Sequence, residues 1–237
     1  MIPHRLQVRT PHQGLGFRGI IDPRPMAESA LPTLLSLASH ELRGPTGVVR
    51  GYLRLLEQDA SLGQRPRRVM VEMTRATERL AALLDELTEL AHLKDGRIKL
   101  ALKRTSLRSV LNQAVQAVEL PDHFETDLDV VAPADVRLRL DETRMRAVFC
   151  TLIATLARVQ SGASSFDLRL VKGRTTTQVV VQPRTLGRGT LAERPVDISR
   201  GGTGLQLPIA DAVVQAHGGR LRERWLAGKF AGFVVKL

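Results

Sequence analysis

The 237-residue sequence has one cysteine, few aromatic residues and no long apolar run. Cys150 has no second cysteine to pair with, so an internal disulfide is excluded and redox chemistry is not expected. Aromatic residues make up 3% of the chain, too few for the stacking platforms that bind single-stranded nucleic acid. The sequence contains no run of about 18 apolar residues that would predict a membrane-spanning helix. Residues 1–25 are polar, with scattered arginine and proline, and do not resemble a secretory signal.

Basic residues outnumber acidic ones, 35 to 24, which gives a formal net charge of +11. A basic chain invites a nucleic-acid interpretation, but the arginines are spread along the sequence instead of clustering. We therefore expect no nucleic-acid partner, no membrane partner and a cytoplasmic location. The basic surface either attracts an acidic protein partner or reflects an arginine-rich composition alone. Hydrophobic residues, at 43%, are ample for a globular core.

Two stretches near the amino terminus carry apolar residues at alternating spacings of three and four, the pattern of an amphipathic helix that buries one stripe. The first stripe comprises Leu35, Ala38, Leu42, Pro45, Val49, Tyr52 and Leu56. The second comprises Val69, Met73, Ala76, Leu80, Leu83, Leu87 and Leu90. Pro45 falls inside the first pattern, which continues beyond it, so it predicts a kink instead of a helix end.

A turn-like stretch at 59–64, followed by Pro66, separates the two predicted helices and makes them an antiparallel hairpin. A hairpin of this size cannot bury its apolar side alone. Pairing two hairpins into a four-helix bundle solves the problem, so the sequence predicts a homodimer.

After Asp95 and Gly96 the pattern changes to helices mixed with strands. Helices are expected at 106–118, 142–159 and 205–216, and strand patterns lie within 126–140 around Pro133. The stretches 166–171 and 176–182 predict a β-hairpin, 186–200 is loop-like, and 220–237 forms two strands around Gly228. This irregular alternation predicts an α+β fold in which an α/β sandwich follows the helical hairpin.

Two motifs carry the chemistry. In the first, Ser39 to Pro45 (SHELRGP), the stripe phase places His40 on the solvent side of its helix, next to Glu41. In the second, Gly201 to Leu207 (GGTGLQL), glycines open a helix that ends at His217, Gly218 and Gly219. Glycines before a helix let backbone N–H groups approach an anion, and the helix N-terminus adds favourable partial charge.

Together the motifs resemble the histidine kinase family of two-component signalling, over about residues 29–237. Ser39 to Arg43 is similar to the phosphoacceptor box, and Gly201 to Leu205 with His217 to Gly219 is similar to the second glycine box of the ATP-binding domain. Asp141, Arg144, Met145 and the strand after Gly228 match in the same order. The resemblance implies an irregular segment at 1–27, a dimerisation and phosphoacceptor hairpin at 28–95 and a degenerate ATP-binding-like domain at 96–237.

By this resemblance His40 is the phosphoryl acceptor. The reaction needs a neutral imidazole with one nitrogen free to attack, and Glu41 is predicted to hold the proton on the other nitrogen and act as general base. Gly202, Thr203, Gly204 and Leu205 are the expected remnant of the nucleotide loop.

The losses lie in the nucleotide site. Thr151 and Thr155 fall where the family has its asparagine box, which leaves Thr155 as a poor candidate metal ligand. The stretch 181–187 lacks the aspartate that binds adenine, and Gln206 replaces a glycine of the loop. A lost hydrogen bond to a charged group weakens affinity roughly tenfold to a hundredfold. ATP binding is therefore expected to be feeble, and the glycine turn to serve as a structural turn. Gly44 stands where members that dephosphorylate their partner carry a threonine or asparagine, which predicts weak or absent phosphatase activity.

These gains and losses favour a phosphorelay protein in which His40 exchanges a phosphoryl group with an aspartate of a response-regulator receiver domain. The transfer itself requires no cofactor, and ATP and Mg²⁺ are needed only if kinase activity is retained. Two alternatives remain: an active ATP-dependent autokinase, and a catalytically silent scaffold for which His40 is dispensable.

Overall fold

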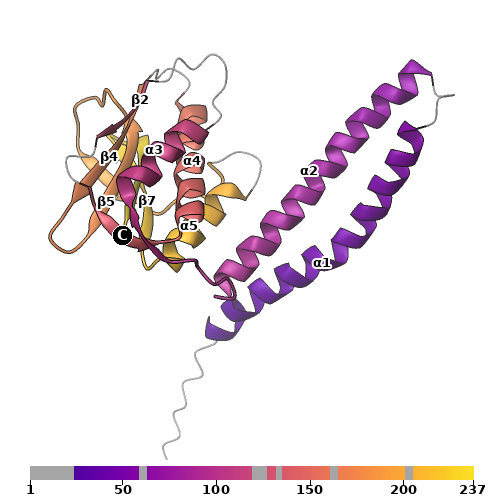
Figure 1. Cartoon of the computed structure of the whole chain (residues 1–237), viewed down its shortest axis with the longest axis horizontal. Helices are drawn as coiled ribbons and strands as arrows, with labels where there is room; N and C mark the ends of the chain where they lie inside the picture. Colours follow the sequence, from indigo (N-terminus) through magenta and orange to yellow (C-terminus); the bar gives the residue numbers. More distant parts are fainter. Residues whose placement is uncertain (1–23, 59–62, 119–126, 132–134, 161–164, 201–204) are drawn as a thin grey trace, which may run out of the picture.

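The computed structural model describes residues 24–58, 63–118, 127–131, 135–160, 165–200 and 205–237. Helices α1 (Arg24–Glu57) and α2 (Gln64–Lys94) form a hairpin that projects from one side of a sandwich of sheet and helices (Figure 1). Helix α1 begins at Arg24, within the segment 1–27 that the sequence predicts to be irregular. Within the described ranges, no helix is both long and apolar enough to cross a membrane.

Helix α1 continues through Pro45 without interruption. Two hydroxyl groups on the same helix donate to backbone carbonyls one turn earlier: Ser39 to Leu35 at 2.7 Å and Thr46 to Leu42 at 2.8 Å. Both hydroxyl groups therefore have hydrogen-bond partners, which allows these polar side chains to be buried inside the hairpin.

The side chains buried along the packed α1 and α2 recur every seven residues, one place after positions of the predicted stripe. They are Ser39, Thr46 and Leu53 on α1 and Met70, Thr77, Leu84 and Ala91 on α2; Leu93, also buried on α2, belongs to the core of the sandwich instead. The predicted stripe itself remains largely exposed on the single chain, as at Leu42 (51%), Val49 (45%) and Tyr52 (66%). Val69, Met73 and Leu80 continue this exposed face on α2. Large exposed apolar patches of this kind mark interaction surfaces.

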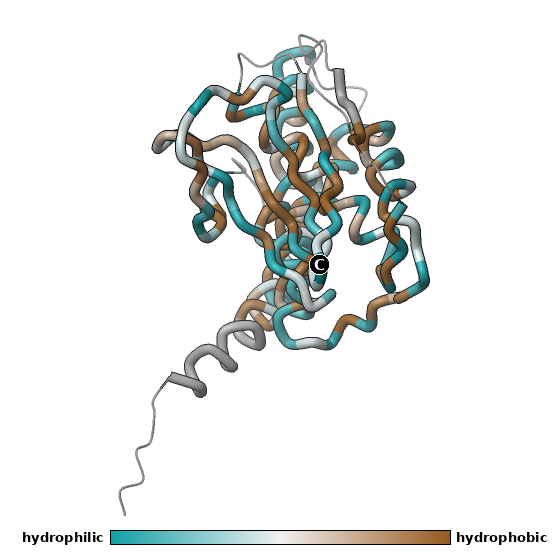
Figure 2. Tube along the Cα trace, turned by 90° about the vertical axis from the view of Figure 1, so that its left-hand side faces the viewer, coloured by the Kyte–Doolittle hydropathy of each residue, from teal (hydrophilic) through white to brown (hydrophobic). Residues whose placement is uncertain are grey.

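A six-stranded sheet forms one layer of the sandwich. Its strand order is β2 (Asp127–Val131), β4 (Ser165–Lys172), β5 (Thr177–Pro183), β8 (Lys229–Lys236), β7 (Arg220–Leu226) and β6 (Leu191–Arg194). Strand β2 pairs in parallel with β4, whereas all other neighbours are antiparallel. Polar and apolar residues alternate along most of β4, as expected when one face is buried, whereas five consecutive residues of β8 are buried. Figure 2 shows both hydrophobic and hydrophilic stretches within the sandwich.

Helices α3 (Leu107–Ala117), α4 (Glu142–Val159) and α5 (Gln206–Ala216) form the second layer, between the sheet and the hairpin (Figure 1). Two short strands, β1 (Lys103–Ser106) and β3 (Arg137–Leu140), form a separate antiparallel sheet. Strand β1 leads into α3, and β3 leads into α4. The core is formed by helix residues such as Phe149 and Ile153 and strand residues such as Phe166 and Phe233, all fully buried.

The structure confirms the α+β class and the hairpin-plus-sandwich order. The helix predicted at 142–159 has these bounds, and the β-hairpin at 166–182 is observed as β4 and β5. The prediction for 186–200 is wrong in part, because Leu191–Arg194 pairs with β7 as an edge strand. All four of its residues are exposed, so no hydrophobic pattern marked it.

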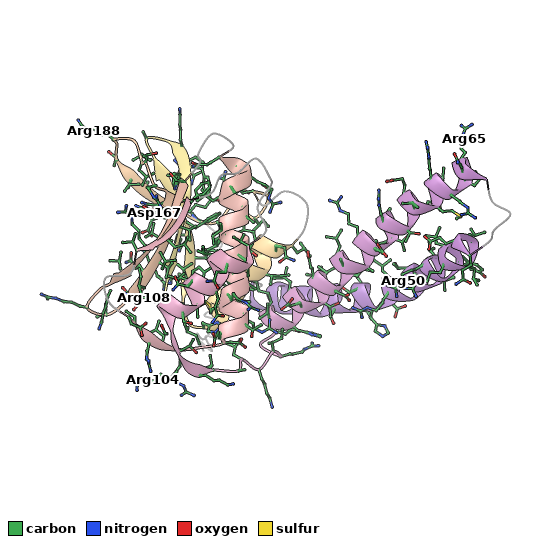
Figure 3. All side chains as sticks on the ribbon, turned by 45° about the horizontal axis from the view of Figure 1, so that its top comes forward. Arg50, Arg65, Arg104, Arg108, Asp167 and Arg188 are labelled. Atoms are coloured by element: carbon green, nitrogen blue, oxygen red, sulfur yellow. The ribbon has the colours of Figure 1, made fainter. Side chains whose placement is uncertain are left out.

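The outer face of the sheet, away from the helices, carries a buried carboxylate. Asp167, labelled in Figure 3, lies on β4. It accepts hydrogen bonds from Arg169 and Arg184 and is 2% exposed. Desolvation by burial raises the pKa of Asp167, but the hydrogen bonds and charges of the two arginines outweigh it and hold that pKa below its usual value.

Candidate functional site

His40 lies in the middle of α1 with its side chain in solvent. The imidazole is 80% exposed and the neighbouring Glu41 side chain is 73% exposed. Their closest atoms, Nδ1 of His40 and Oε1 of Glu41, are 3.7 Å apart, which is slightly longer than a hydrogen bond. A small rotation of either exposed side chain closes this gap and would leave Nε2 available to a reacting group.

Polar contacts fix the two helices to each other close to His40. Arg43, one turn further along α1, pairs with Asp85 at 2.9 Å and contacts Thr88 at 3.3 Å, both on α2. Ser39, immediately before His40, is fully buried. The histidine therefore projects from a part of α1 that side-chain contacts join to α2, and its ring is exposed.

Gly44 is exposed, and a Cβ added there would meet no atom within 4 Å. A threonine or asparagine side chain would therefore fit at this position. Packing within the single chain therefore does not require glycine at position 44. The lack of a polar side chain there is a chemical difference from the resembled proteins that have phosphatase activity.

Of the four predicted loop residues, Gly202, Thr203 and Gly204 lie outside the described residues. Leu205 is the N-cap of α5 and offers no side-chain cap to the helix. Its backbone N–H donates instead to Oε2 of Glu86 on α2 at 2.8 Å, and the Gln206 amide donates to Oε1 of the same carboxylate. Sequence patterns did not single out Glu86, because an acidic residue on a helix face is usually solvated.

A cavity of about 460 Å³ opens between α2, α4 and α5. Thr151, the first residue of the asparagine-box position, lines it together with Asp141, Arg144, Gln206 and the α2 residue Glu89. Arg144 and Glu89 form an ion pair at its mouth. The cavity therefore lies at the seam between hairpin and sandwich.

Thr155, the proposed metal ligand, is 1% exposed and is not among the residues that line this cavity. Its hydroxyl has no hydrogen-bond partner among the described residues. The stretch 181–187, where the resembled kinases hold adenine with an aspartate, contains no aspartate, and its first three residues are buried at the end of β5. No group of three or more His, Cys, Asp or Glu side chains in the described part of the chain is arranged so that it could hold a metal ion.

Among the described residues, the asparagine-box position offers no amide or carboxylate oxygen to Mg²⁺. A divalent ion in a nucleotide site prefers oxygen ligands such as carboxylates and amides. The asparagine-box position supplies Thr151, which lines the cavity, and the buried Thr155, and the stretch 181–187 supplies no carboxylate.

The closing motif, His217 to Gly219, has a structural role in this fold. His217 accepts the Asp141 N–H through Nε2 at 3.0 Å, and its Nδ1 lies 2.8 Å from the Val213 carbonyl. Since an N–H only donates and a carbonyl only accepts, these partners fix the neutral tautomer with the proton on Nδ1. Gly218 has φ +77°, and a Cβ on Gly219 would lie 2.5 Å from the Lys236 carbonyl, so both positions favour glycine.

Residues 31–96 match the His Kinase A (phospho-acceptor) domain. The probable sensor histidine kinase TcrY of Mycobacterium tuberculosis is 33% identical over 234 residues, which cover 90% of this chain and 47% of that protein. The phosphate regulon sensor protein PhoR of Pseudomonas aeruginosa is 31% identical over 211 residues, which cover 82% of this chain and 47% of that protein. The chain spans about half the length of these curated relatives.

Solved structures share the fold. The full-length ShkA structure, in complex with AMPPNP, has a TM-score of 0.63 at 20% identity and covers 86% of this chain and 45% of that one. The histidine kinase AdeS of Acinetobacter baumannii has a TM-score of 0.52 at 17% identity and covers 84% of this chain and 96% of that one. The chain belongs to the two-component histidine kinase family.

Proposed function

We propose that this chain transfers phosphoryl groups in a two-component relay, with His40 as carrier and an aspartate of a response-regulator receiver domain as the other partner. The observation that supports this most directly is the exposed imidazole beside Glu41, within the segment that matches the phosphoacceptor domain. The proposal separates two activities that the family combines, because the phosphoacceptor position is intact while the nucleotide contacts are not.

The bonds formed and broken in this transfer balance without ATP. Nε2 of neutral His40 attacks phosphorus of the receiver's aspartyl phosphate, an N–P bond forms and the acyl O–P bond breaks, which restores the receiver carboxylate. The proton on Nδ1 stays there or passes to Glu41, which lies 3.7 Å away. The reverse reaction passes the group to a second receiver, and Glu41 orients the ring in both directions.

The same proposal includes a homodimer. Leu42, Val49 and Tyr52 on α1 and Met73 and Leu80 on α2 leave a continuous apolar face exposed on the single hairpin. Packing two such faces together makes a four-helix bundle, removes the apolar surface from water and leaves His40 at the outside.

An ATP-dependent autokinase is the second candidate. It is supported by the similarity to a probable sensor histidine kinase across 90% of this chain, whereas the burial of Thr155 and the lack of an aspartate in 181–187 argue against it. Regulation without phosphotransfer would leave His40 dispensable.

The test mixes the full chain with receiver domains that carry ³²P on aspartate. We expect acid-labile label on the wild-type chain and none on His40→Gln, while His92→Gln, a histidine change on α2, accepts label normally. Equal labelling of His40→Gln would refute His40 as carrier. Label on His40 after incubation with Mg²⁺ and γ-³²P-ATP alone would instead establish the autokinase.

A further inference from the structure

Three polar contacts join α2 of the hairpin to the sandwich, two of them at the two ends of α5 and one on α4. Glu86 binds the first residues of α5, Glu89 pairs with Arg144 of α4, and Lys94 Nζ donates to Gln215 Oε1 near the end of α5 at 3.2 Å. Glu86 and Glu89 are three residues apart and so share one face of α2. The hairpin therefore meets the sandwich along one face of α2, and the α2 residue Leu93 is buried in the sandwich core beside these contacts.

The charges on this face complement the dipole of α5. A helix carries partial positive charge at its N-terminus and partial negative charge at its C-terminus. Glu86 places a carboxylate at the first end and Lys94 places an ammonium group near the second. Since α2 and α5 run in the same direction along this contact, a reversed orientation of the sandwich would put both charges at the wrong ends.

The contact at Glu86 also supplies what α5 lacks. The N-cap residue Leu205 has no side-chain acceptor for the free N–H groups of the first turn. Both oxygens of the Glu86 carboxylate are used, one by the Leu205 N–H at 2.8 Å and the other by the Gln206 amide. Gln206 is the residue that replaces a glycine of the resembled loop, and glycine could not make the second bond.

We propose that Glu86 and Gln206 form a clamp that fixes the sandwich on the hairpin, so that Glu86 is a positioning residue. The clamp lies next to Asp85, the partner of Arg43, and thus at the level of the hairpin that carries His40. In this arrangement the sandwich is a fixed platform, and it limits the side from which a receiver reaches His40. That last consequence rests on the proposed relay function, whereas the clamp itself does not.

The experiment measures docking by crosslinking. Lys94→Cys and Gln215→Cys, both at exposed positions, are introduced in a Cys150→Ala background and treated with a short bis-maleimide. Crosslinks within one chain are separated from crosslinks between chains by their mobility in denaturing gels. Glu86→Gln, Glu86→Ala and Gln206→Gly are compared with Glu78→Gln, which makes the same charge change at an exposed position of α2.

We expect Glu86→Ala and Gln206→Gly to slow crosslinking within the chain about tenfold, since each removes part of a charge-assisted cap. Glu78→Gln should crosslink at the parent rate. The exchange Glu86→Gln with Gln206→Glu should recover most of the rate, because it restores an amide–carboxylate pair. Parent-like rates for Glu86→Ala and Gln206→Gly, with helicity unchanged, would overturn the clamp.

The experiments can refute the relay proposal and the clamp proposal independently. His40→Gln leaves the crosslinking rate unchanged if the clamp exists, whether or not the chain accepts phosphate. If the parent accepts label from a receiver, Glu86→Ala should keep His40 reactive while its preference among receivers changes. A loss of all transfer in Glu86→Ala with normal docking would contradict a positioning role.

Discussion

Replacement of Asp141 by alanine should destabilise the sandwich by about 2 to 4 kcal/mol. Asp141 is 8% exposed at the start of α4. Its Oδ1 accepts the Arg144 N–H at 3.1 Å as a helix N-cap, and its Oδ2 accepts the Ala101 N–H at 3.0 Å. Loss of the cap costs about 1 kcal/mol, and leaving the second N–H without its acceptor costs about 1 to 3 kcal/mol.

The pH dependence follows from the same contacts. Burial raises the pKa of Asp141, but the hydrogen bonds from Ala101 and Arg144 and the charge of Arg144 outweigh it and lower that pKa below 3.8. The unfolded chain therefore binds the proton first as the pH falls, so the carboxylate contributes fully above the ordinary aspartate pKa. Its contribution is lost as the pH falls through the lowered native value.

Urea unfolding followed by fluorescence of Trp225, the one tryptophan of the chain, reports on the sandwich. The gap in unfolding free energy between wild type and Asp141→Ala should be largest near pH 7 and should shrink below pH 3.8. Asp141→Asn keeps a single acceptor oxygen and should fall between them. A gap under about 0.5 kcal/mol at pH 7, or one that is constant with pH, would refute the cap argument.

Three further predictions test other parts of the molecule. Val49→Asp, on the exposed apolar face, should shift the chain toward monomer in light scattering, whereas Leu37→Asp, exposed but off the stripe, should not; monomer in the wild type would contradict the bundle. Asp167→Asn should cost about 2 kcal/mol at pH 7 in urea unfolding, because Arg169 and Arg184 lose their shared carboxylate. That cost should vanish in acid, as the lowered pKa of Asp167 requires, and a cost that persists there would point to packing instead. Gly44→Thr should fold normally, since nothing crowds the site, and should speed release of phosphate from a phosphorylated receiver; an unchanged rate would show that the missing side chain is not the limiting group.

The heptad spacing predicted both long helices, and the apolar and polar alternation predicted β4 and β5, because these patterns repeat over many residues. The strand β1 was missed because its four residues, Lys103–Ser106, are mostly exposed and show no alternation of apolar residues. The stripe on α1 was recognised, but the structure buries its neighbours Ser39 and Thr46 within the hairpin. Serine and threonine do not register in a hydrophobic pattern, so the packing geometry of the two helices had to reveal this second stripe.

The sequence by itself determined the helical hairpin, the α+β class and the presentation of His40, because each follows from local periodicity and from motifs of adjacent residues. The tertiary structure alone decided that Glu86 caps α5, that the Asp141 N–H and the Val213 carbonyl select the tautomer of His217, and that Thr155 is enclosed in the sandwich. These contacts join residues far apart in the chain, such as the pair of Glu86 and Leu205 separated by 119 positions. Their partners are set by how the layers stack, which no short stretch of sequence encodes.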